Sequence, residues 1–200
     1  MSLVKKILLW LNFPRFLPHL ALFYLNYKSC CDDVRNTLKM PPPTCNNKNE
    51  LVSVQAFLYL MVFDRYYRNL FYYRVGKWKY LISFLAKPHP CLTIGTYTVI
   101  GKGCHFEHPF ATIINAQSIG DNFEVRNNVT IGAKGKGCPV IKNNVIINSN
   151  SVVIGEIVVG NNVEVGAGTV LTKSVPDNCV VVGNPAYILT ENGIRVNKKL

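Results

Sequence analysis

The sequence predicts a mainly β fold, in which a parallel β-helix follows an α-helical N-terminal region. Two observations predict it. The stretch 94–176 repeats every six residues, and Ile, Val, Leu or Phe leads all of its units but one. A fixed repeat matches neither the helical period of about 3.6 residues nor the strand period of about two, and it is typical of solenoids. Residues 1–86 lack this repeat and read as helical.

Each six-residue unit predicts one short strand and one corner. The apolar leader should point inward, and the fifth residue should lie beside it. Gly, Asn and Asp follow the leaders because corners need a positive φ or a close backbone approach. Three units make one triangular turn, so about four turns fit, each packing on its neighbours. The fifth position is small or β-branched at Thr98, Cys104, Val129, Val145, Ser151, Val163 and Thr169.

Two irregularities interrupt the repeat. One extra residue lies between Thr112 and Ser118, which gives a seven-residue step. Four extra residues lie between Ile131 and Ile141. Insertions in a solenoid become loops on one face, and that face often holds the functional site.

The helical pattern breaks at 87–90, where two prolines occur. Before this break, a loop at 41–49 should separate two helical blocks, and Glu50–Tyr73 predicts one long helix that ends near Gly76. We therefore expect three segments: a helical N-terminal region at 1–86, a β-helix domain at 87–188 and a C-terminal tail at 189–200.

The cysteines indicate the compartment. The chain has seven, an odd number, and none form a C-x-x-C motif. This pattern predicts a reducing, cytoplasmic setting with neither a disulfide framework nor a zinc site. Cys104 occupies a small inward position of the repeat and reads as a core residue.

The N-terminus begins like a signal peptide, with Lys5 and Lys6 before an apolar run. Pro14 and Pro18 interrupt that run, and no small-residue cleavage site follows. No apolar stretch reaches the roughly 18–20 residues of a membrane span. Two interpretations stay open: helices that pack within the protein or on neighbouring subunits, and an amphipathic helix in peripheral contact with a membrane.

The formal net charge is +11, and basic residues alternate with aromatics in 65–80. Nothing in the chain matches a nucleic-acid-binding module, so a nucleic-acid partner is not expected. The basic run fits electrostatic steering of an anionic cosubstrate, an acidic glycan or a membrane surface. It also fits a solvated helix face whose Arg and Lys stems cover apolar surface.

Four segments carry a resemblance to a known family. They are RNLFYYRVG (68–76), IGKGCHFEH (100–108), VTIGAKGKG (129–137) and VPDNCVVVGNPA (175–186). With the order of helical region and β-helix, they resemble the left-handed β-helix of hexapeptide-repeat acyltransferases. The chain is most similar to the serine acetyltransferase branch, and within it to relatives encoded with surface-polysaccharide enzymes.

This resemblance implies an enzyme that moves an acetyl group from acetyl-CoA to a hydroxyl. It implies a homotrimer, with acetyl-CoA in a groove between adjacent subunits, and no metal. A hydroxyl needs a base to take its proton as it attacks the thioester, and histidine suits this role. His108 falls on the family's catalytic position, and Glu107 beside it could position His108 or the acceptor. His105 and His89 read as structural.

Two positions depart from the resemblance. Thr93 stands where the family has an Asp that orients the base, and Cys138 stands where it has a second His before a Pro. Both family residues help to bind serine, so the departures put serine in doubt as the acceptor. Cys138 as a nucleophile, with an acyl-cysteine intermediate, is a less favoured alternative.

The resemblance also implies a cosubstrate site made largely of small residues. Lys173 should meet a phosphate of coenzyme A, and a backbone N–H near Gly132 and Ala133 could stabilise the oxyanion. Corner geometry alone could also account for the small residues. The expected contacts of coenzyme A are Gly132, Ala133, Ser149, Gly166, Ala167, Lys173, Pro185 and Ala186.

These residues are compatible with several functions. The leading hypothesis is O-acetylation of a sugar hydroxyl in a surface polysaccharide or its precursor. The alternative is a serine O-acetyltransferase of cysteine biosynthesis. A metal-dependent enzyme needs three convergent His, which the spacing of His89, His105 and His108 does not supply.

Overall fold

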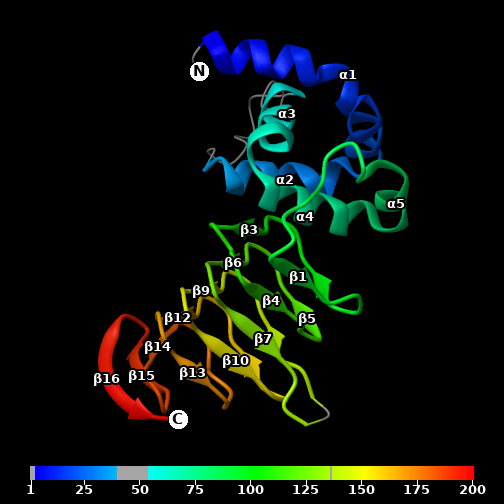
Figure 1. The fold of residues 1–200 in the computed structure, drawn as a ribbon. Helices are drawn as coiled ribbons and strands as arrows, with labels where there is room; N and C mark the ends of the chain where they lie inside the picture. The colour runs from blue at the N-terminus through cyan, green and yellow to red at the C-terminus, as the bar shows by residue number, and fades with distance from the viewer. Residues whose placement is uncertain (1–2, 40–53, 136) are drawn as a thin grey trace. The chain divides into compact units, whose positions relative to one another are not determined.

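The computed structural model describes residues 3–39, 54–135 and 137–200, and the chain forms two compact units (Figure 1). Met1–His89 form a helical unit, and Pro90–Leu200 form a β unit. The division falls where the two prolines break the helical pattern.

The helical unit packs around large apolar side chains. Phe16, Phe23, Phe57, Phe71 and Met61 are all less than 2% exposed. The predicted loop at 41–49 lies outside the described residues. The helices are α1 (Leu3–Leu25), α2 (Tyr27–Thr37), α3 (Val54–Phe63), α4 (Arg65–Val75), the 3₁₀ helix η1 (Gly76–Trp78) and α5 (Lys79–Ile82).

The prediction of one long helix over Glu50–Tyr73 is wrong in the described part of that range. α3 ends at Phe63, and Asp64 then caps a new helix: its carboxylate accepts from the backbone N–H groups of Tyr66 and Tyr67, at 2.8 and 3.0 Å. An N-cap Asp satisfies donors that a helix start leaves without partners. The predicted end near Gly76 is confirmed, because Gly76 is the C-cap of α4 with φ +59°.

Two arginines of the basic run 65–80 serve the helical unit itself. Arg68 is 8% exposed and donates to the carbonyls of Met61, Val62 and Lys87. Arg74 makes a two-bond ion pair with Asp33, at 2.7 and 3.0 Å, which links α4 to α2. These guanidinium groups are therefore committed to structural contacts.

A buried histidine links α1 to α4. Tyr72 donates its hydroxyl proton to the Ala86 carbonyl (2.7 Å), so the same oxygen accepts from Nε2 of His19 (2.8 Å). Burial, reinforced by the charges of Arg15 and Arg68, lowers the pKa of His19 to about 4. His19 is thus neutral in the folded protein near pH 7.

The β unit is a parallel β-helix with three faces, as predicted (Figure 1). Face one holds β1 (Leu92–Ile94), β4 (Thr112–Ile114), β7 (Thr130–Gly132), β10 (Val152–Ile154) and β13 (Val170–Leu171). Face two holds β2 (Val99–Ile100), β5 (Ser118–Ile119), β8 (Val140–Ile141) and β11 (Val158–Val159). Face three holds β3 (His105–Phe106), β6 (Glu124–Val125), β9 (Ile146–Ile147), β12 (Glu164–Val165) and β14 (Cys179–Val182).

Two antiparallel strands extend face three beyond β14. They are β15 (Tyr187–Glu191) and β16 (Ile194–Lys199). Most of the segment 189–200, expected as a C-terminal tail, therefore belongs to this sheet. β15 pairs with β14 and β16 pairs with β15, so the hairpin covers that edge of face three.

The inward positions match the repeat. Leaders such as Ile131, Ile147 and Val165 are fully buried. The seven small or β-branched fifth residues are also buried, including Cys104. At the corner between faces two and three, Asn122, Asn144, Asn162 and Asn178 have φ of +55° to +60° and join through side-chain hydrogen bonds of 2.8–2.9 Å. The expected corner chemistry is confirmed.

The first irregularity lies elsewhere than predicted. The inward residues Phe106 and Ile114 are eight positions apart, whereas Ile114 and Ile119 are only five apart. The surplus therefore sits at 107–111, before β4, and not between Thr112 and Ser118. The second insertion is a loop after β7, in which Lys134 and Gly137 pair antiparallel.

Candidate active site

Face one has two edges, and the candidate residues divide between them. Its parallel strands begin at the corner shared with face three, which we call the first edge. They end at the corner shared with face two, which we call the second edge. The expected site residues lie on these two edges, on β1, and just beyond β14.

His108 lies on the first edge, in the longer segment 107–111 that joins β3 to β4. Its side chain is exposed, and its backbone has φ +50°. Ala111 (φ +54°) occupies the corner that Asn128, Asn150 and Gly168 occupy in the later coils, so His108 is a second residue at positive φ in the longer segment. Residues other than glycine at positive φ are uncommon, and they tend to cluster at functional sites.

Glu107 is held by an ion pair next to His108. Its carboxylate lies 3.0 Å from Nε of Arg126, and Arg126 also donates to Glu124 at 3.3 Å. The contact follows from the register, because the N–H of Glu107 bonds to the carbonyl of Val125, one coil along. The sequence analysis did not single out Arg126; the spacing of successive coils could have found it.

Thr93 and Cys138 lie in different places. Thr93 is exposed at the centre of β1 and pairs with Ile113 of β4, the strand that the His108 segment enters. Cys138 is half-buried in the loop beyond the second edge. Within one chain, Thr93 and His108 therefore lie on neighbouring coils. Cys138 lies beyond the second edge of face one, and His108 lies at the first edge.

Three of the expected cosubstrate residues lie at the second edge. Gly132 ends β7 and Ala133 follows it, and Lys173 follows β13. A Cβ added to Gly132 would meet nothing within 4 Å, and Gly132 does not have a positive φ. Neither packing nor backbone conformation explains this glycine. The open space above it suits the close approach of an extended ligand.

The small residues at the first edge have internal explanations. A Cβ at Gly166 would lie 2.7 Å from Cγ1 of Val182, so the packing of the coils itself requires a glycine. Ser149 donates its hydroxyl proton to Oδ1 of Asn127, at 2.6 Å. Ala167 is exposed. Packing between coils therefore accounts for Gly166, whereas it does not account for Gly132.

Lys173, Pro185 and Ala186 come together around one small cavity. It has a volume of about 150 Å³, and Val170, Thr172, Asn184 and Leu200 complete its lining. The Lys173 ammonium donates to a main-chain carboxylate oxygen of Leu200. The structure thus gathers three expected contacts of the cosubstrate, with one positive charge among them.

Within residues 3–39, 54–135 and 137–200, no three His, Cys, Asp or Glu side chains lie close enough together to hold a metal ion. His105 is half-buried on β3, and His89 belongs to the helical unit, where its N–H donates to the Asn69 side chain (2.8 Å). Within one chain, His108 is exposed beside the paired Glu107 at the first edge of face one, and Gly132 lies open at the second edge.

Comparison with known proteins gives three kinds of match. The model of the family described as bacterial transferase hexapeptide (six repeats) matches residues 138–173. A serine acetyltransferase of Synechococcus elongatus is 30% identical over 185 residues, covering 86% of this chain and 72% of the relative. One from Staphylococcus epidermidis is 30% identical over 176 residues, covering 84% of this chain and 80% of the relative.

Solved structures share the fold. Serine acetyltransferase from Neisseria gonorrhoeae matches with a TM-score of 0.64 and 21% identity, over 94% of this chain and 71% of that one. The soybean apoenzyme matches with a TM-score of 0.65 and 22% identity, over 88% of this chain and 74% of that one. Both alignments extend well beyond the repeats, since the β unit alone is 111 of the 200 residues.

Proposed function

The chain belongs to the serine acetyltransferase family of hexapeptide-repeat transferases, and from this premise we propose that it is an acetyl-CoA-dependent O-acetyltransferase with His108 as general base. The observation that carries the proposal is the placement of His108. It is exposed at positive φ on the one longer segment of the first edge, beside an ion-paired carboxylate. Because the β-helix fold also carries other chemistry, the proposal depends on this site.

The reaction begins with the acceptor hydroxyl near the imidazole of His108. The imidazole takes the hydroxyl proton while the oxygen bonds to the thioester carbonyl carbon. The bond from carbon to sulfur then breaks, and the departing sulfur takes the proton back from the imidazolium. Glu107, held in place by Arg126, would position His108 or the acceptor.

The two edges of face one support a site shared between copies of the chain. Face one separates His108 from Gly132 within one chain, because a three-residue strand with its corner spans about 10 Å at roughly 3.3 Å per residue. Reacting groups must come within about 3–3.5 Å. In a homotrimer, the first edge of one copy faces the second edge of its neighbour. Gly132, Ala133 and Lys173 would then hold acetyl-CoA beside the neighbour's His108.

The acceptor is the finer part of the proposal. The names of the relatives favour L-serine, the second-ranked acceptor of the sequence analysis, over the sugar hydroxyl that it ranked first. A sugar hydroxyl stays the second candidate for one specific reason. Thr93 and Cys138 replace residues that the resemblance associates with serine binding, and Thr93 presents only an exposed hydroxyl.

The test is release of free thiol from acetyl-CoA by the wild type and three variants, with L-serine and a panel of sugar acceptors. His108→Ala should lower kcat by about 10²–10⁴-fold with whichever acceptor supports turnover. Gly132→Val should raise KM for acetyl-CoA and leave thermal stability unchanged, because its side chain would enter open space.

Cys138→Ala is the matched control for covalent catalysis and should keep its turnover. Loss of activity in Cys138→Ala, with full activity in His108→Ala, would replace the proposed mechanism by one with an acyl-cysteine. Turnover with a sugar but not with L-serine would assign the second candidate acceptor.

A further inference from the structure

One side of α1 stays apolar and exposed. Leu3, Ile7 and Trp10 lie four and three residues apart before Pro14, and Leu17 and Tyr24 lie seven residues apart after it, so each set lies along one side of its part of the helix. We call these five residues the stripe. Their exposed fractions are 74%, 50%, 75%, 51% and 58%. Among the residues that the structure describes, four more apolar side chains of α1 are exposed large hydrophobics: Val4, Leu8, Leu11 and Leu25.

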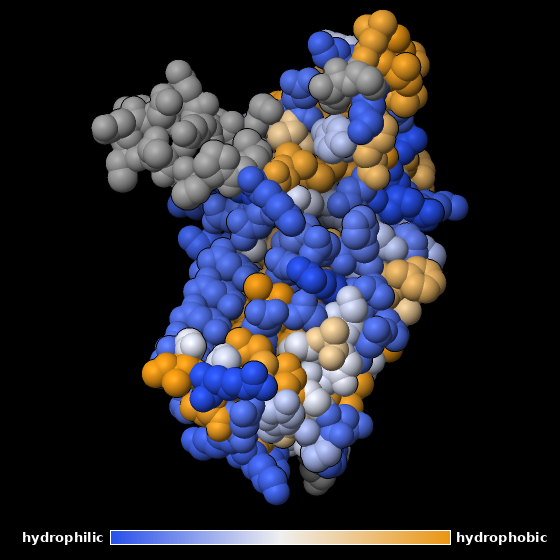
Figure 2. Space-filling view, turned by 90° about the vertical axis from the view of Figure 1, so that its left-hand side faces the viewer, coloured by the Kyte–Doolittle hydropathy of each residue, from blue (hydrophilic) through white to orange (hydrophobic). Residues whose placement is uncertain are grey.

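Other side chains of α1 pack inside the helical unit. Leu9, Phe16, Leu20 and Phe23 are buried in the core of the helical unit. α1 is therefore apolar nearly all round, a pattern typical of helices with protein on one side and another apolar phase on the other. Figure 2 shows hydrophobic residues gathered at the end of the helical unit, with hydrophilic ones beside them.

The charge of α1 and its surroundings indicates which apolar phase would cover the stripe. α1 contains Lys5, Lys6 and Arg15 and no Asp or Glu. The segment 1–89 has 13 Lys and Arg against 4 Asp and Glu, whereas 90–200 has 9 against 7. Most of the net charge of +11 therefore belongs to the part of the chain that carries the apolar stripe. Anionic lipid surfaces attract such basic segments.

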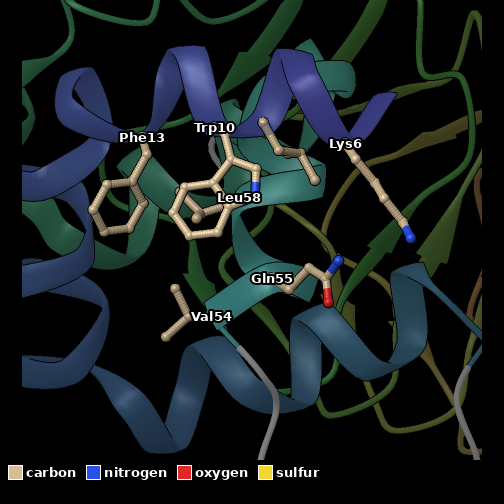
Figure 3. A pocket seen from close by; sticks show the side chains of 7 residues that line it. Lys6, Trp10, Phe13, Val54, Gln55 and Leu58 are labelled. Carbon is tan, nitrogen blue, oxygen red and sulfur yellow. The ribbon is translucent and has the colours of Figure 1, made fainter. Parts of the chain in front are cut away.

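A pocket beside the stripe has the same character. It lies between α1 and α3, has a volume of about 430 Å³, and is lined by Lys6, Leu9, Trp10, Phe13, Val54, Gln55 and Leu58 (Figure 3). Trp10 and Phe13 supply aromatic walls, and Lys6 adds an ammonium group. Aromatic rings with basic neighbours are the side chains that anchor proteins at the boundary of headgroups and acyl chains.

We propose that α1 lies in the surface of an anionic lipid bilayer, with the stripe Leu3, Ile7, Trp10, Leu17 and Tyr24 among the acyl chains. Lys6 and Arg15 then reach back to the headgroups along the same helix. The helix lies on the bilayer: in the described residues, no helix is long and apolar enough to cross a membrane. The inference is independent of the acceptor and of His108.

The test is co-sedimentation of the full chain with phosphatidylcholine vesicles that contain or lack phosphatidylglycerol. The wild type should bind only the anionic vesicles, and added salt should weaken binding. Trp10→Ser/Leu17→Ser should lower the partition coefficient at least tenfold. Lys6→Gln/Arg15→Gln should lower it about 25-fold and reduce the salt dependence, since each basic residue near the surface contributes a factor of about five.

The matched control is Tyr97→Ser/Ile194→Ser, which removes two apolar side chains of the β unit that are 93% and 69% exposed. It should bind like the wild type. Equal binding by Trp10→Ser/Leu17→Ser and by this control would overturn the proposal, as would a wild type that does not bind anionic vesicles. A third result would also overturn the proposal: a wild type that binds no vesicles, together with a lower oligomeric mass for Trp10→Ser/Leu17→Ser. That result would assign the stripe to contact with a second copy of the chain.

Discussion

The helical unit and the β-helix satisfy their polar groups in different ways. The helical unit relies on a few long-range contacts, such as Asp33 with Arg74 and His19 with Tyr72, which join residues 41 and 53 positions apart. The β-helix repeats one contact from coil to coil, as in the asparagine ladder from Asn122 to Asn178, whose hydrogen bonds join residues 22, 18 and 16 positions apart. One lost contact should therefore matter more in the helical unit, where nothing repeats it.

The largest effect should follow Arg74→Met. Asp33 is 1% exposed, and the variant would leave its charge buried and unpaired, which typically costs about 3–5 kcal/mol. Trp10 and Trp78 are the two tryptophans, and both lie in the helical unit, so urea unfolding followed by Trp fluorescence reports on this unit.

Arg35→Met is the control, because its pair with Asp32 is long (3.8 Å) and partly exposed. It should cost less than about 1 kcal/mol. If Arg74→Met and Arg35→Met lowered the free energy of unfolding equally, the buried pair would have no special role. The difference between the helical unit and the β-helix would then be smaller than proposed.

An intermediate effect should come from acidification through His19. Above pH 6.5 the histidine is neutral in both the folded and the unfolded chain, so its contribution is constant. Between pH 6.5 and about 4 the unfolded chain binds the proton and the folded chain does not, so the free energy of unfolding falls. The loss should reach roughly 3 kcal/mol at most, at about 1.4 kcal/mol per pH unit.

Urea midpoints from Trp fluorescence at several pH values measure this loss. His19→Gln keeps a donor for the Tyr72 oxygen and cannot titrate, so its midpoint should vary less over the same range. A variant with the same pH dependence as the wild type would assign the effect to other groups.

The smallest effect should follow Asn144→Ala in the β-helix. Asn144 has φ +56°, accepts from Asn122 and donates to Asn162, and its neighbours keep the rest of the ladder. Loss of two exposed hydrogen bonds and the cost of Ala at positive φ should total about 1–2 kcal/mol. Thermal unfolding followed by the β-sheet signal in circular dichroism measures it.

Asn197→Ala provides the comparison, because Asn197 also has positive φ (+47°) but lies outside the ladder. Its cost should be smaller, and the difference is the value of the ladder bonds. A loss in Asn144→Ala as large as that of Arg74→Met would contradict the idea that repetition protects the β-helix.

The same contrast explains what could be predicted from sequence. In the β-helix each residue type recurs at a fixed place, so the leaders, the small fifth positions and the corners were predictable from one repeat. The prediction failed where the repeat breaks. Counting residues between apolar leaders did not show that the extra residues lie at 107–111. Arg126 was missed for a related reason, since its partner lies one coil away.

In the helical unit, the sequence predicted the helices and the end near Gly76, but not the boundary between α3 and α4. Asp64 ends the apparent long helix because its carboxylate caps α4, and an apolar pattern does not reveal a cap inside it. The basic run 65–80 was ambiguous between steering and structure. Only the positions of Met61, Val62, Lys87 and Asp33 show that two of its arginines are structural.

The most direct test of the account is the rate of thiol release from acetyl-CoA with L-serine, measured for the wild type and His108→Ala at equal protein concentration. The account predicts turnover by the wild type with L-serine or, failing that, with a sugar acceptor, and a fall of about 10²–10⁴-fold in the variant. A folded His108→Ala protein that turns over at the wild-type rate would contradict it.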